Sequence, residues 1–346
     1  MSSFAIFTNK NNEKFQVDVH FNLWNKNYDD NYLDIGIMSY DLKDSQKIYV
    51  WFPFKVEPEQ INDLKTSLED IDIINAIFNE NYTLERTGNT KWIYINQNEK
   101  CKFRIYLLDI SQDISIADKE KLGFYKNDNS SVVELAINRD NNNKKSDFPV
   151  YLRFRIKLPE ITEIIHEYNK PHHWIRGAFS KNYVIDFRYN DKRSFSASEN
   201  EILTNKYYLA QTKKLHFLLM TKVYVDVECS TDVKKRRLEP NIWKKYVLDD
   251  DTTDIIAYHA TKKIVNQDTL EDIGSWEFFA KQTVETENWK LLIFFIIFTI
   301  FLGAIGSLAG NYLDNLISNY TFSTSSNIIP KVGEEIVYFI QSHCIF

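Results

Sequence analysis

The chain has 346 residues, of which 44% are apolar and 26% charged, a balance that is typical of a globular protein with a sizeable core. Its formal net charge of −6 argues against wholesale binding of duplex nucleic acid, although a local basic patch is compatible with it. The three cysteines, Cys101, Cys229 and Cys344, have neither zinc-ligand spacing nor a disulfide framework, so a reducing cytosol is the compartment that they favour.

Short segments with strand periodicity dominate residues 1–265. Sequences such as KFQVDVHFNLW (14–24), YLDIGIMSYDL (32–42) and NYVIDFRYN (182–190) alternate in the way that half-buried strands do. Helical periodicity is clearest over residues 57–78 and recurs briefly over residues 159–168. Many strands and few helices predict a β-dominated α+β fold, a sandwich or an open barrel with inserted helices.

Two related β-rich units are expected within this region. An aromatic strand followed by Pro, Glu and a helical pattern occurs at residues 48–64 and again at 150–165. The polar loop NRDNNNKKSD lies between them and marks a boundary near residue 145. The predicted units are therefore 1–145 and 146–265, and the alternative is a chance similarity between two strand–helix junctions.

Motifs of common catalytic sites do not occur in the sequence. It contains no Walker A loop, no GxGxxG, no CxxC pair and no GxSxG. His166 and Glu167 begin like the zinc motif HExxH, but His172 follows at the wrong spacing to share a helical face. Asp226 and Glu228 share one face of a predicted strand, yet the lysines that follow come after a turn. We therefore expect a protein that is not an enzyme and has no metal ion or cofactor.

The densest basic segment is KKRRLEPNIWKK, residues 234–245. Basic groups around an aromatic ring suit an anionic ligand that carries a base, through phosphate pairing and stacking, so a small nucleotide or oligonucleotide signal is one expected partner. Anionic lipid headgroups and a plain solvated loop are the alternatives. Arg176, in HHWIRGAFSKNY, marks a second candidate anion site. The other predicted ligand-binding residues are Lys234, Lys235, Arg236, Arg237 and Trp243.

A helical connector is predicted over residues 266–290. Asp268 can serve as its N-cap, and apolar residues follow at helical spacing. Such a helix can run straight into the next segment, or it can pack on the domain or lie on a membrane surface. The apolar residues are Leu270, Ile273, Trp276, Ala280 and Val284.

Residues 291–310, LLIFFIIFTIFLGAIGSLAG, carry no charge. Twenty residues of helix rise about 30 Å, the thickness of a bilayer's hydrocarbon core. The sequence therefore predicts a transmembrane helix over 291–312 and a short extracytoplasmic tail over 313–346, and the alternative is a buried helix of a soluble protein. Lys281 and Lys290 precede the span, so the positive-inside rule predicts a single-pass protein of the inner membrane with its N-terminal region in the cytoplasm.

Small residues recur every fourth position in the second half of the span. Gly306 and Gly310 form a GxxxG pair, and Gly303 with Ser307 repeats the spacing. This pattern lets helix backbones approach closely and predicts a homo-oligomer within the lipid bilayer. Asp314, about one turn beyond the apolar run, can form a carboxylate ring at the mouth of a pore. A chance GxxxG and a carboxylate among headgroups are the alternatives.

The order of these parts resembles that of transmembrane effectors from bacterial antiphage systems that respond to nucleotide signals, such as the CBASS, Pycsar and Hailong types. The resemblance rests on the span at 291–310 behind a β-rich region, and it transfers no ligand residue. It implies a cytosolic sensor domain that controls an oligomeric transmembrane pore or membrane disruption in antiphage defence. The alternatives are a membrane-tethered adaptor or scaffold and a membrane-anchored enzyme that processes nucleic acid.

Overall fold

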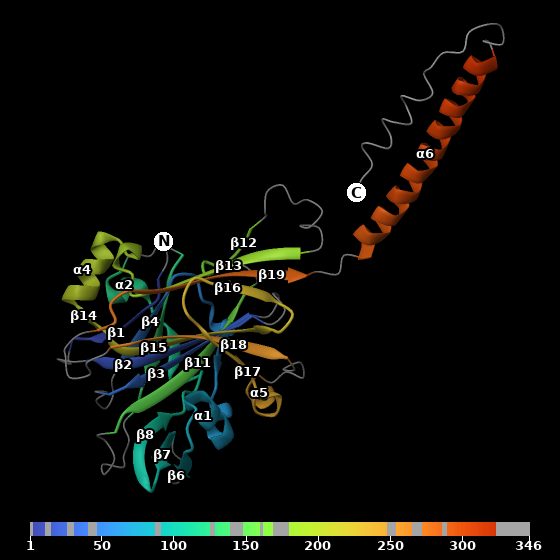
Figure 1. The fold of residues 1–346 in the computed structure, drawn as a ribbon. Coiled ribbons are helices and arrows are strands. Elements are labelled where there is room, and N and C mark those ends of the chain that lie inside the picture. The colour runs from blue at the N-terminus through green and yellow to red at the C-terminus, as the bar shows by residue number, and fades with distance from the viewer. Residues whose placement is uncertain are drawn as a thin grey trace. The chain divides into compact units, whose positions relative to one another are not determined.

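The computed structural model of the chain is drawn in Figure 1. The chain divides into two compact units, residues 1–286, called the β domain below, and residues 287–346. The β domain consists mainly of strands, and the second unit contains one long apolar helix, so the predicted β-dominated α+β fold followed by a C-terminal helix is confirmed. The described residues are 3–10, 15–25, 31–40, 47–86, 91–124, 129–138, 148–159, 162–168, 180–247, 254–264, 272–285 and 289–322.

Ten strands of the β domain form one large sheet. Its order is β17 (Lys234–Arg237), β18 (Ile255–Lys263), β15 (Gln211–Lys222), β2 (Gln16–Asn25), β3 (Asn31–Ser39), β11 (Val150–Leu158), β8 (Lys100–Tyr106), β7 (Trp92–Gln97) and β6 (Thr83–Arg86), with β5 (Ile61–Asp63) paired to β11. The pairs β2–β15 and β8–β11 are parallel, and the other neighbouring pairs are antiparallel.

Two smaller antiparallel sheets lie against the large one. The five-stranded sheet has the order β14 (Tyr207–Leu209), β1 (Ala5–Asn9), β4 (Lys47–Phe52), β10 (Ser131–Ala136) and β9 (Ile114–Ile116). The four-stranded sheet has the order β12 (Ile165–Glu167), β13 (Ser180–Tyr189), β19 (Trp276–Glu285) and β16 (Asp226–Cys229). The helices are α1 (Ile71–Phe78), α2 (Lys119–Leu122), α4 (Ala197–Asn205), α5 (Pro240–Val247) and α6 (Trp289–Phe322), with 3-10 turns η1 (Pro58–Gln60), η2 (Ser67–Glu69) and η4 (Lys192–Ser194).

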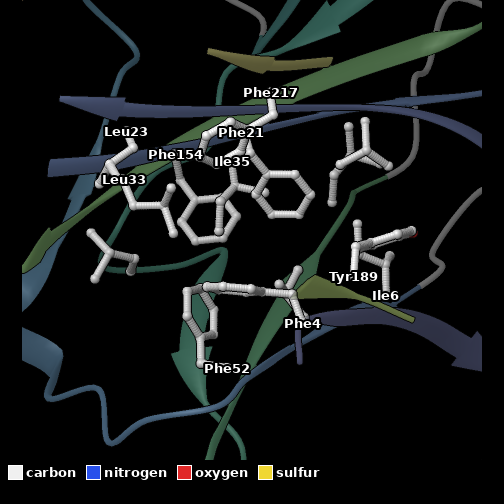
Figure 2. Packing of buried hydrophobic residues seen from close by; sticks show 14 of the residues in the cluster. Phe4, Ile6, Phe21, Leu23, Leu33, Ile35, Phe52, Phe154, Tyr189 and Phe217 are labelled. Carbon is white, nitrogen blue, oxygen red and sulfur yellow. The ribbon is translucent and has the colours of Figure 1, made fainter. Parts of the chain in front are cut away.

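The main core fills the space between the large sheet and the two smaller sheets (Figure 2). Strand alternation sends every second side chain of each sheet into this layer. The ring centroid of Phe21, in the large sheet, lies 4.7 Å from that of Phe187, in the four-stranded sheet. The Phe187 ring in turn lies 5.0 Å from that of Phe4, which directly precedes β1 of the five-stranded sheet. Each fully buried ring of this kind stabilises the fold by about 1.5–3 kcal/mol, so aromatic packing joins the three sheets.

Helices cover the outer faces of the sandwich (Figure 1). α1 and α5 pack on the outer face of the large sheet, where they bury a second apolar cluster. α2 and α4 pack on the outer face of the five-stranded sheet over a third cluster. Inserted helices are thus present, as the predicted fold class expects, and they close the two outer faces of a sandwich.

A buried ionic network lies beneath α5. Both carboxylate oxygens of Asp34 accept hydrogen bonds from Arg155, at 2.6 and 3.1 Å, and Asp34 also accepts bonds from Trp24 Nε1 at 2.8 Å and Tyr246 Oη at 2.7 Å. Arg153 donates to Tyr246 Oη at 2.6 Å and lies 3.5 Å from Asp34. Burial alone would raise the pKa of Asp34, but the charges of Arg155 and Arg153 outweigh it and lower that pKa.

The β domain does not divide near residue 145. β2 pairs with β15, and β3 pairs with β11, so strands from both predicted units share one sheet. Residues 1–286 accordingly form one compact unit. The prediction of separate units at 1–145 and 146–265 is wrong because long-range strand pairing overrides the local similarity of two strand–helix junctions.

The connector predicted as a helix over 266–290 contains strand β19 instead. Trp276, Ala280 and Val284 are spaced by four, and a spacing of four places side chains on one face of a strand as well as of a helix. The intervening Phe278 and Gln282 are buried too, so the burial has a period of two. The segment forms a strand because β19 pairs with β13 along its whole length.

The two other helical predictions, for residues 57–78 and 159–168, are also corrected. Over residues 57–78, only the last part forms α1, which Asp70 caps, and two 3-10 turns and β5 precede it. Over residues 159–168, Ile165–Glu167 form β12.

Candidate ligand pocket and membrane helix

The basic residues Lys234–Arg237 form the edge strand β17 of the large sheet, and all four are exposed. Their side chains alternate between the two sides of the strand. Arg237 pairs with Asp254 at 2.7 Å, Arg236 pairs with Glu239, and Lys235 lies 5.1 Å from the centre of the Tyr258 ring. Charged edge strands also protect a sheet against pairing with other chains.

Trp243 cannot stack on a ligand as the sequence predicts. It is 5% exposed, and its ring lies 5.7 Å from Trp24 and 5.4 Å from Tyr246 in the cluster between α5 and the large sheet. The reason is that α5 is amphipathic, with Trp243, Tyr246 and Val247 on its buried face. The predicted grouping of Trp243 with the basic strand is therefore wrong, and Arg176 lies outside the described residues.

A large open pocket of about 980 Å³ lies at the β13–η4 turn, between α4, β14 and the segment before β19. Its volume is at the upper end of the range for small-molecule sites. Its apolar wall contains Phe195, Leu203, Tyr207 and Leu209. Its polar wall includes Lys10, Asn190, Asp191, Lys192, Arg193, Tyr208, Gln211, Asp272 and Ser275.

Two amide oxygens in the pocket wall lack hydrogen-bond partners among the described residues. Asn190 follows β13 with a left-handed backbone (φ 53°), which asparagine tolerates, and its backbone N–H donates to Phe4 O at 2.8 Å. The side chain is 5% exposed, and neither its Oδ1 nor the buried Oε1 of Gln211 has a partner. Buried acceptors without partners are costly, and both residues line the pocket, but the two oxygens themselves have almost no exposed surface.

The pocket also carries positive charge. Lys10 and Lys192 contribute cations, and Arg193 contributes a third that is held 3.0 Å from Asp191. Hydrogen bonding to Arg193 lowers the pKa of Asp191, which therefore stays ionised and fixes the guanidinium at the wall. The arrangement suits a ligand with an anionic group for the cations.

The sequence does not reveal this pocket because its wall comes from segments that are far apart, from Lys10 to Ser275. None of these segments carries a motif. The one local signal is the run YNDKRS at 189–194, whose Asn and Asp favour a tight turn. A turn of this kind after a strand indicates a loop, and only the fold brings the other segments to it.

Three histidines on neighbouring strands form a half-buried cluster on the outer face of the large sheet. His216 lies opposite His20 in the pairing register, and its ring stacks on His259 with 4.9 Å between centroids. Nδ1 of His216 is 2.7 Å from Nε2 of His259. Burial, reinforced by the charge of Lys214, lowers the pKa of His216 to about 3, and burial also lowers the pKa values of His20 and His259.

We expect the β domain to lose stability as the pH falls below about 6.5, the ordinary pKa of an unfolded histidine. The folded state holds these imidazoles neutral, so unfolding takes up protons, and the stability present above pH ~6.5 is lost on acidification. His216→Phe should make the loss shallower by about 1.4 kcal/mol per pH unit between roughly pH 6 and pH 4. Guanidinium unfolding of the full-length protein in mild detergent, repeated across this range, measures the slope.

Thr261→Val supplies the control for this measurement. It removes the 2.8 Å contact between the Thr261 hydroxyl and His259 Nε2 but keeps all three imidazoles, so the slope should match that of the unchanged protein. A His216→Phe protein whose stability falls as steeply as the unchanged protein would contradict the prediction.

Within the part of the chain that the structure describes, one helix is long and apolar enough to cross a membrane, Trp289–Ser318. Its side chains over residues 289–318 are mostly exposed, and none of its most apolar stretch is buried against the described residues. The helix continues to Phe322, so residues 313–322 of the predicted tail are helical instead. The predicted span at 291–312 lies entirely within α6.

The predicted small-residue positions lie on one face of α6. At about 100° per residue, Gly303, Gly306, Ser307 and Gly310 fall within roughly 100° of arc, and Asp314 continues the same stripe. A Cβ placed on any of these three glycines would meet no atom of the described residues within 4 Å, so the described part of the chain leaves the stripe open. The helix thus presents a flat face that a second helix can approach.

No protein-family model matches the sequence, and no curated protein is significantly similar to it. Among the described residues, no group of three or more His, Cys, Asp and Glu side chains is arranged to hold a metal ion. The features on which a function can be built are therefore the pocket of the β domain and the exposed apolar helix α6.

Proposed function

We propose that the protein is a membrane-anchored effector. In this proposal α6 spans the inner membrane once, the β domain lies in the cytoplasm, and a small ligand bound in the pocket changes how the α6 helices associate. The observation that carries the proposal is the long apolar helix with an exposed stripe of small residues, joined to a domain that contains a large polar pocket. Association into an oligomer would line a pore or disrupt the membrane, with Asp314 at its mouth.

A small nucleotide is the proposed ligand class. Phosphates pair with Lys10, Lys192 and Arg193, while a base packs against the apolar wall of the pocket. The pocket volume of about 980 Å³ accommodates a ligand of this size. The layout resemblance to nucleotide-responsive effectors makes antiphage defence the proposed biological setting.

Replacing Lys192 tests the location of the ligand site. A panel of mono- and oligonucleotides is added to the full-length protein in detergent, and binding is measured by thermal shift and calorimetry. Lys192→Glu should weaken binding of the best ligand by at least about tenfold, because it replaces a phosphate-pairing cation with a like charge. Lys235→Glu on β17 should leave affinity unchanged.

The Lys235→Glu variant also decides between the pocket and the basic strand. A loss of binding in Lys235→Glu together with full binding in Lys192→Glu would move the ligand site to β17. Lys55→Glu, an exposed lysine outside the pocket, controls for the change in net charge.

Native mass spectrometry of the full-length protein, extracted gently from membranes, tests the proposal as a whole. A discrete oligomer that gains the mass of a bound nucleotide is the expected result. A monomer at every protein concentration would instead indicate that α6 is only an anchor, as in a membrane-tethered adaptor.

A further inference from the structure

The turn between β15 and β16 exposes two apolar side chains. Val223 is 54% and Tyr224 is 61% exposed, more than any other large apolar side chain among the described residues of the β domain. The backbone of the turn is fixed, since Val223 N–H donates to Asp254 O at 2.8 Å and Val225 N–H donates to Lys222 O at 3.1 Å. An ordered loop thus holds an aromatic and an aliphatic group out towards solvent.

Basic residues of β17 lie beside this turn. A shallow groove of about 150 Å³ is lined by Val223 together with Lys235, Arg236 and Arg237. We call these residues, with Tyr224, the tip surface. Carboxylates accompany the cations, because Asp254 pairs with Arg237 and Glu239 with Arg236. Exposed ion pairs of this kind contribute little stability, so a phosphate can replace the carboxylate as the partner.

The tip surface lies at the end of the β domain where β19 finishes. Asp226, next to the turn, pairs in register with Thr283 of β19. Asn25, at the end of β2, donates to Gln282 of β19 at 2.7 Å. Both contacts fall within three residues of Glu285, the last residue of the strand.

A short segment joins this end of the β domain to α6. Only residues 286–288 separate the end of β19 from the start of α6. Four steps from one residue to the next reach at most roughly 14 Å, which limits the distance from Glu285 to Trp289, the first residue of α6. Aromatic residues favour the headgroup level, and Lys and Arg are attracted to anionic lipid.

We propose that the tip surface docks on anionic lipid headgroups of the membrane that α6 spans. The inference rests on α6 as a membrane helix, which is part of the proposed function, but it does not depend on the ligand pocket. Tyr224 and Val223 enter the headgroup layer, while Lys235, Arg236 and Arg237 pair with lipid phosphates. Docking of this kind fixes the β domain against the bilayer.

Hydrogen exchange of the full-length protein in nanodiscs tests this proposal. Nanodiscs of phosphatidylcholine alone are compared with nanodiscs that contain roughly one third phosphatidylglycerol. Amides of residues 222–226 and 234–237 should exchange at least about fivefold more slowly in the anionic discs, because lipid covers them. The double variant Val223→Ser, Tyr224→Ser should remove this difference.

Tyr40→Ser is the matched control. Tyr40 is 42% exposed and follows Ser39, the last residue of β3. This end of β3 is the one away from the tip surface, so the loss of Tyr40 should leave the lipid-dependent protection in place. Equal exchange of the tip segments in both kinds of nanodisc would overturn the docking proposal. Failure of the full-length protein to enter any nanodisc would overturn the membrane helix itself, so the two failures are distinguishable.

Discussion

Asp34→Ala should lower the free energy of unfolding by about 3–5 kcal/mol, a large share of the roughly 5–15 kcal/mol that stabilises an ordinary domain. The carboxylate is fully buried and is the acidic partner of both Arg153 and Arg155. Removing it leaves two guanidinium groups in the interior, where an unpaired charge is far more costly than the pair was favourable. Guanidinium unfolding of the full-length protein in detergent, followed by tryptophan fluorescence, measures the change.

Tyr246→Phe serves as the graded comparison. It removes one hydroxyl, which donates to Asp34 at 2.7 Å and accepts from Arg153 at 2.6 Å, but leaves the carboxylate and both arginines in place. The expected cost is about 2–3 kcal/mol, because two hydrogen bonds to charged groups are lost while the ion pairs of Asp34 remain. An Asp34→Ala variant that is destabilised no more than Tyr246→Phe would contradict the view that the buried ion pairs between β3 and β11 contribute more to stability than the Tyr246 hydroxyl does.

The same network shows where strand patterns stop being informative. Alternation in YLDIGIMSYDL and VYLRFRIKL correctly predicts strands β3 and β11, and it also places Asp34, Arg153 and Arg155 on the polar side of each strand. A polar side is normally solvated, yet here α5 covers it and the charges pair with one another. Local sequence determines which side a residue faces, but only tertiary packing determines what covers that side.

The candidate sites also differ in whether local sequence is enough to predict them. The long apolar helix that could cross a membrane was predictable, because a long uncharged run needs no information from elsewhere in the chain. The connector was not, because Trp276, Ala280 and Val284 fit a strand and a helix equally well. The pocket was not predictable either, since Asn190 and Gln211 meet in one wall only where the fold brings separate strands together.

The double variant Gly306→Leu, Gly310→Leu should abolish association of the membrane helices. Both glycines lie on the small-residue stripe, and a Leu side chain at either position holds a neighbouring backbone away. Leucine keeps helix propensity and apolar character, so insertion in the membrane should be unchanged. The expected result in native mass spectrometry is a shift from oligomer to monomer, with association at least about tenfold weaker.

Ala304→Leu provides the matched control for this prediction. It introduces the same side chain into the same helix, but about 100° around the axis from Gly303 and outside the stripe. Oligomers should therefore persist in Ala304→Leu and disappear in the glycine variant, because a Leu side chain blocks association only when it lies on the face through which the helices make contact. If both variants assemble equally well, association does not use this stripe. The β domain would then have to change the membrane through contacts outside α6, contrary to the proposed function.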